Sequence, residues 1–211
     1  MKRTLLLLGL VAALTGYFGP WVDHRAAGLV ITGLDLGETV KFLPSVRSGE
    51  VLLWRPGFYA PLVAGATAAL LAAYRRDFRL GVWLRLPVLL AALVATANLV
   101  PPAWTPARLM ELEFRTQTGA LIVLLVGLAF SPFLALLPPR IAAIVTSLPT
   151  AAGIILPIYG YLQVLPLLAE LYRQPLSPAW GPWLTSLGLI VLALAHWLPQ
   201  RPPVANPSPG A

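Results

Sequence analysis

The sequence predicts an all-α membrane protein, a polytopic bundle of about six transmembrane helices. Of its 211 residues, 58% are hydrophobic and 11% are charged, whereas soluble domains average about 45–50% and about 25%. Long uncharged runs recur from one end of the chain to the other. In lipid the backbone must satisfy its own hydrogen bonds, so such runs form helices or a closed barrel. Barrel strands alternate in polarity and these runs do not, which favours helices.

We expect one helical domain over residues 1–198, followed by a disordered tail over 199–211. Five of the 13 tail residues are proline and none follows an apolar period, a composition that buries too little surface to order a chain. The expected spans cover residues 4–20, 58–74, 83–100, 118–137, 141–168 and 183–198.

The first run, LLLLGLVAAL, follows Lys2 and Arg3. A signal peptide has the same layout, and its removal would leave five spans. No small-residue cleavage site is clear, so an uncleaved helix is favoured, with Trp21 as an interfacial anchor. At the other end of the bundle His196 ends the sixth span, where we expect an interfacial side chain with a wet polar edge.

Between the first two spans, the segment HRAAGLVITGLDLGETVKFLP is too polar to cross a membrane. Leu36, Val40 and Leu43 fall at helical spacing, while Asp35 and Glu38 share another face. This pattern predicts an amphipathic helix lying on the outer surface, with its apolar side on lipid or on the bundle.

Four polar residues around this segment, Asp23, His24, Asp35 and Glu38, are candidate partner or ligand contacts. Paired acids suit glycosidic chemistry only when a substrate is held between them, and no sugar platform accompanies these. A nucleophilic system would need a serine or threonine beside Asp23 and His24, and none is marked out. A solvated polar face is therefore the favoured interpretation, and no catalytic residue is assigned.

The fifth span contains three prolines, at positions 149, 157 and 166. Each proline removes a backbone donor and bends a helix. Transporters build binding sites from the exposed backbone of broken helices, which makes Thr146, Thr150 and Gly153 candidate contacts near the first proline. A kink that serves packing alone is the competing interpretation, and it is favoured.

The net charge of +7 reflects topology rather than nucleic-acid binding, because the basic residues form no continuous block. With the N-terminus inside, the inner segments hold eight basic residues and one acid, and the longer outer segments hold seven of each. Cytoplasmic loops gather Lys and Arg. We therefore expect both termini in the cytoplasm of a cell-membrane protein.

Cysteine is absent and only two histidines occur. Disulfides, thiolate nucleophiles and iron–sulfur clusters are thereby excluded, the histidine spacing fits no metal site, and we expect neither metal nor cofactor. The leading function is a non-catalytic accessory or scaffold subunit, whose partners are the lipid bilayer and other membrane subunits that contact its outer loops. A small-solute or ion permease component that uses a broken fifth helix is the alternative, and an intramembrane enzyme is the second alternative.

Overall fold

The computed structural model describes residues 1–23, 30–101 and 105–199, which form nine α-helices, four 3-10 turns and one two-stranded ribbon. The long helices are α1 (Lys2–Phe18), α4 (Ala60–Ala73), α5 (Val82–Ala97), α6 (Arg115–Ala129), α8 (Pro139–Tyr172) and α9 (Gly181–Trp197). These six coincide with the six predicted helical segments, which confirms the all-α class. His24 and the predicted tail beyond residue 199 lie outside the described residues.

The remaining elements are short. The α-helices are α2 (Gly33–Thr39), α3 (Pro44–Arg47) and α7 (Ser131–Leu134). The 3-10 turns are η1 (Val40–Phe42), η2 (Arg55–Tyr59), η3 (Arg76–Phe78) and η4 (Arg108–Met110), and the strands are β1 (Val22–Asp23) and β2 (Ser177–Pro178).

Two described segments, Arg55–Ala73 and Pro139–Tyr172, are long and apolar enough to cross a membrane by length and composition. Helices α5, α6 and α9 are also apolar but have 15 to 17 residues. A spanning helix needs about 20 apolar residues, within a range of about 17 to 25. By this criterion two segments indicate a membrane protein.

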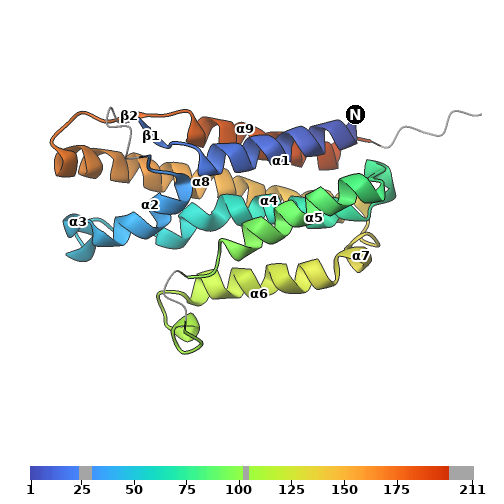
Figure 1. Cartoon of the computed structure of the whole chain (residues 1–211), viewed down its shortest axis with the longest axis horizontal. Helices are drawn as coiled ribbons and strands as arrows, with labels where there is room; N and C mark the ends of the chain where they lie inside the picture. Colours follow the sequence, from blue (N-terminus) through green and yellow to red (C-terminus); the bar gives the residue numbers. More distant parts are fainter. Residues whose placement is uncertain (24–29, 102–104, 200–211) are drawn as a thin grey trace, which may run out of the picture.

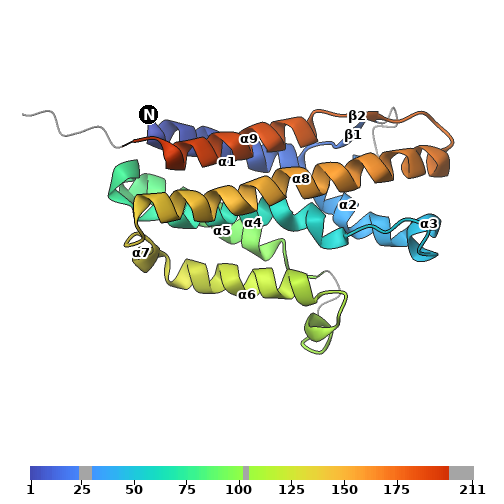
Figure 2. The same cartoon turned by 180° about the vertical axis from the view of Figure 1, so that it is seen from behind.

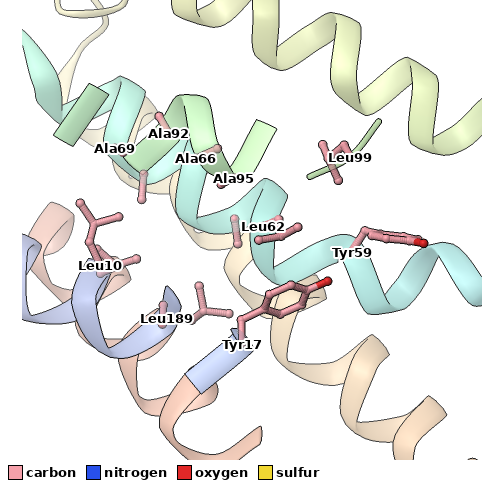
Figure 3. Close-up of a cluster of buried hydrophobic side chains, with 14 of the residues drawn as sticks. Leu10, Tyr17, Tyr59, Leu62, Ala66, Ala69, Ala92, Ala95, Leu99 and Leu189 are labelled. Atoms are coloured by element: carbon pink, nitrogen blue, oxygen red, sulfur yellow. The ribbon is translucent and has the colours of Figure 1, made fainter. Parts of the chain in front are cut away.

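Helix α4 runs through the middle of the bundle. Seven of its 14 residues are alanine, and 11 of the 14 are buried. Helices α1 and α9 lie together on one side of α4, α8 lies beside it, and α6 lies farthest out beyond α5 (Figures 1 and 2). Figure 3 shows Leu10 and Leu189 reaching toward Leu62, Ala66 and Ala69 of α4. Because alanine has little bulk, the neighbouring helices approach α4 closely.

The chain's first and last long helices, α1 and α9, pack antiparallel through glycine. A methyl group at Gly16 would meet the backbone nitrogen and hydroxyl of Thr185, and one at Gly188 would meet the backbone of Ala13. The two backbones are therefore in direct contact, which only glycine permits here. Beyond this contact, the ribbon β1–β2 pairs Val22 with Pro178 and Asp23 with Ser177, so the helix ends are also joined.

The interfacial role expected for Trp21 is wrong. Its side chain is 1% exposed and lies edge-on against Tyr17 and Tyr161. The indole donates to the carbonyl of Gly16, and Tyr161 donates to the Trp21 carbonyl at 2.8 Å. The ribbon turns the chain back over the bundle at this point, so the indole enters the core instead of facing lipid.

The predicted surface helix is shorter than expected. Its regular part begins at Gly33, because Thr32 and Asp35 form a capping box: the Thr32 hydroxyl accepts from the Asp35 amide and the Asp35 carboxylate accepts from the Thr32 amide. The chain then continues as η1 and α3. Leu36, Val40 and Leu43 are buried in the core, so the apolar side lies on the bundle.

Two further span predictions change in detail. The fourth span, expected as one helix over 118–137, ends at Ala129 and is followed by the separate turn α7. Pro132 in α7 cannot donate a backbone hydrogen bond to the preceding turn, which ends the regular ladder. Helix α8, by contrast, is continuous over 34 residues although it contains Pro149, Pro157 and Pro166.

The glycine contact between α1 and α9 predicts that Gly188→Ala destabilises the bundle by about 1–3 kcal/mol, because an added methyl must displace backbone atoms. Gly119→Ala is the matched control: a methyl at Gly119 of α6 meets nothing within 4 Å, so the change should be neutral or stabilising by up to about 1 kcal/mol. Thermal unfolding of both variants in the same detergent measures the difference. Equal unfolding temperatures would contradict direct backbone contact.

Candidate functional site

Five polar residues from four segments meet at the end of the bundle where α4 begins, and we call them the Glu38 cluster: Glu38, Lys41, Arg55, Tyr59 and Glu113. Lys41 Nζ donates to Glu38 Oε2 at 2.9 Å, and the Tyr59 hydroxyl donates to Glu38 Oε1. Arg55 lies between two acids, with its guanidinium 3.3 Å from Glu113 Oε1 and 3.9 Å from Glu38 Oε2. The cluster thus joins α2, η1, η2 and the segment before α6.

Arg55 is the most deeply buried charged residue of the cluster, with 8% of its surface exposed. Its guanidinium donates to the Glu113 carbonyl at 3.3 Å and lies 5.0 Å from the centre of the Phe114 ring. A buried charge is costly unless it is paired and hydrogen-bonded. The two carboxylates, the carbonyl and the ring compensate part of that cost, although one guanidinium nitrogen, Nη1, has ion-pair contacts and no hydrogen bond among the described residues.

The environment of Glu38 lowers the pKa of its carboxyl group. Burial alone would raise this pKa, but hydrogen bonds from Tyr59 and Lys41 and the positive charges of Lys41 and Arg55 outweigh burial. Glu38 is therefore a carboxylate at neutral pH. This state suits an acceptor in an ion-pair network and does not suit a general acid.

A second polar cluster, the Asp77 cluster, lies at the opposite end of α4 and consists of Lys2, Arg75 and Asp77. Lys2 Nζ donates to Asp77 Oδ2 at 2.9 Å, and Arg75 Nε donates to Asp77 Oδ1 at 3.2 Å. Burial raises the pKa of Asp77, but the Lys2 hydrogen bond and the charge of Arg75 outweigh burial and lower it overall. Arg75 also donates to the Leu137 carbonyl at 2.8 Å, so this cluster fixes the loop before α8.

His196 lies beside the Asp77 cluster and does not have the wet edge that was expected. Its ring is 4.9 Å from the Phe78 ring, and its side chain is 5% exposed. Nδ1 lies 3.0 Å from the Leu192 carbonyl of the same helix. The turn η3 folds over the end of α9 and covers this ring.

Two other predicted contact residues are Asp35, which has a structural role, and Asp23, which is exposed. Asp35 caps α2 as described above. Asp23 is exposed on β1, beside an open depression lined by Trp180 and Trp183. Asp23, Asp35 and Glu38 therefore do not form one acid cluster, and no group of three or more His, Cys, Asp or Glu among the described residues could hold a metal ion.

The candidate contacts in α8 lie on a packed face. Thr146 is fully buried and its hydroxyl donates to the Ala142 carbonyl one turn earlier. A methyl group at Gly153 would come within 3.2 Å of Ala60 and Ala64 of α4. Thr150 is 5% exposed and its hydroxyl has no hydrogen-bond partner in the described structure. Thr146 and Gly153 therefore lie where α8 packs against its neighbours.

The Glu38 cluster contains four residues that were not among the predicted contacts: Lys41, Arg55, Tyr59 and Glu113. The last three lie 17 to 75 residues from Glu38, so no local spacing connects them. One signal was present in RPGFYAP, where an arginine directly precedes an apolar helix. Such a charge must find an acid at the helix end if the segment is buried.

Comparison with protein-family models, with curated proteins and with solved structures finds no match to this chain.

The lowered pKa of Glu38 predicts an acid-sensitive contribution to stability. Because the pKa is lower in the folded state, the charge stabilises the fold above the ordinary glutamate pKa of about 4.3, and this contribution is lost as pH falls through the folded-state value. Glu38→Gln should destabilise the protein at pH 7 by about 1–3 kcal/mol. The deficit should shrink toward pH 3, as measured by thermal unfolding. Glu50→Gln, at an exposed glutamate, should match the wild type, and a deficit independent of pH would contradict the ion-pair role.

Proposed function

We propose that this chain is a multi-pass helical protein of the cell membrane and a non-catalytic accessory or scaffold subunit. The observation that carries the proposal is the separation of charge from the apolar middle: the two ionic clusters lie at opposite ends of α4. The 3-10 turn η2 and α4 together span about 30 Å. The hydrocarbon core of a bilayer is also about 30 Å thick, so the clusters match its two surfaces.

The outward faces of the long helices support the same proposal. Large apolar side chains are exposed on five of the six long helices, among them Leu8 on α1, Leu90 on α5, Val123 on α6, Leu148 on α8 and Leu187 on α9. Water would disfavour such an extensive apolar surface on a monomer, whereas lipid accommodates it. We therefore propose that α1, α5, α6 and α9 also cross the membrane although they are short. Both termini would lie in the cytoplasm with the Asp77 cluster, and the Glu38 cluster would lie outside.

Polar side chains inside the helices support a role without catalysis or transport. The hydroxyls of Thr96, Thr146, Ser147 and Thr185 each donate to a carbonyl one turn earlier in their own helix. Side chains bonded in this way are satisfied locally. These four hydroxyl groups are therefore less available to bind a solute, which favours a scaffold over the permease alternative.

The loops at the Glu38 cluster support a docking role. The ion pairs hold the segments before α4 and before α6 together, and these segments expose large apolar side chains: Leu52 is 87% exposed and Leu112 is 91% exposed. Exposed apolar residues on a fixed polar framework are typical of protein interaction sites. A neighbouring membrane subunit is the partner that we propose for this surface.

The docking proposal predicts that affinity purification of the tagged chain in mild detergent recovers a stoichiometric membrane protein. Replacing Leu52 and Leu112 with serine should reduce recovery of that partner at least tenfold, because apolar contacts dominate such surfaces. Leu136→Ser is the matched control, since Leu136 is 80% exposed at the opposite end of the bundle. Recovery of no partner, or equal loss in the control, would refute the proposal that these loops dock a subunit.

A further inference from the structure

A cavity of about 170 Å³ lies between α4, α6 and α8. Small or ring-shaped side chains create the space, among them Ala60, Ala120, Pro149 and Ala152. Trp54 and Thr116 are exposed side chains of the lining and mark its open side. Tyr59 belongs both to the lining and to the Glu38 cluster, so the ion-pair network closes one end of the cavity.

One polar side chain of the lining, Gln117, is left incompletely bonded. Gln117 is 2% exposed, and its Nε2 donates to the Leu99 carbonyl at 2.8 Å. A carbonyl oxygen only accepts, so this bond fixes which side of the amide carries the oxygen. The remaining atom, Oε1, is buried and has no hydrogen-bond partner in the described part of the chain. A buried acceptor of this kind requires a donor.

We propose that this cavity binds the polar end of a membrane lipid with a free hydroxyl group, which donates to Gln117 Oε1. The hydrocarbon chain of the lipid lies against Ala120 and Ala152, which line the cavity. The inference rests on the proposed function, because only a chain embedded in the bilayer brings this cavity to the level of the polar ends of membrane lipids.

The size and polarity of the cavity select this class of ligand. An apolar cavity of about 150 Å³ holds one benzene molecule, so about 170 Å³ admits one small polar end or chain segment and excludes a whole lipid. Charged headgroups are disfavoured because walls made of carbon do not solvate an ion.

The position of Gln117 agrees with a lipid hydroxyl. Gln117 is the third residue of α6, so it lies within about one helical turn, about 5 Å, of the helix end. In a spanning α6 this is the level at which the polar ends of lipids begin. Ala120 follows three residues later on the same face of α6, which aligns the chain of the lipid with the rest of the cavity.

The test compares two probes that differ in the donor: monooleoylglycerol, which carries two hydroxyls, and methyl oleate, which carries none. Binding of each probe to the purified chain is titrated by native mass spectrometry. The wild type should bind monooleoylglycerol about fivefold or more tightly, the size expected for one neutral hydrogen bond. Gln117→Leu should erase this preference.

Two further variants make the result specific. Gln163→Leu is the matched control, because Gln163 on α8 also has a buried Oε1 without a partner but does not line the cavity; it should keep the wild-type preference. Ala152→Leu fills the cavity and should weaken both probes. If Gln117→Leu does not fold, Ala152→Leu alone tests the site. Undiminished binding of both probes to Ala152→Leu would then overturn it.

Equal binding of the two probes to the wild type, or a preference that survives Gln117→Leu, would overturn the inference. Membrane fractionation of the cells that express the protein distinguishes failure of the proposed function from failure of the lipid site. A chain recovered in the soluble fraction would refute the proposed function, whereas a membrane-bound chain without probe preference refutes the lipid site alone.

Discussion

Seven alanines in the 14 residues of α4 leave a surface with little side-chain bulk, and the other long helices pack around it (Figure 1). Apolar helices gain nothing by leaving lipid for one another, so their association depends on close van der Waals contact between small residues. The glycine contact between α1 and α9 extends the same principle to backbone against backbone. Bulky side chains of these helices consequently point outward, which gives the bundle its apolar surface.

The two ionic clusters follow from the same central helix. A spanning helix of small apolar residues leaves no place for charge along its length, so the charged residues gather where it starts and where it stops. At both ends of α4, ion pairs connect segments that are distant in the sequence. Lys2 pairs with Asp77, and Arg55 pairs with Glu38 and Glu113. Each cluster fixes the loops at its own end. The loops held by the Glu38 cluster also border the cavity that Gln117 lines. The geometry of these loops and the shape of the proposed lipid site therefore depend on the same ion pairs.

The sequence predicted the helices well and the side-chain contacts poorly. Apolar runs depend on local composition, and the six long helices lie where those runs occur. Glu38 contacts Arg55 and Tyr59, which lie 17 and 21 positions away, and no period reveals such contacts. Trp21 and His196 were expected at the lipid interface, as residues of their type usually are; both are buried because a ribbon and a 3-10 turn fold over them. The short helix α2 was expected to be longer because its capping residues, Thr32 and Asp35, were not recognised.

The central claim is that the Glu38 and Asp77 clusters lie on opposite sides of one membrane. The chain has no cysteine, so single cysteines report without background. Cysteine replaces Glu111, an exposed residue near the Glu38 cluster, or Arg76, an exposed residue beside Asp77, and intact cells are treated with a membrane-impermeant maleimide. We expect reaction at position 111 at once and at position 76 only after permeabilisation. Reaction at both positions in intact cells, or at neither until permeabilisation, would contradict the claim.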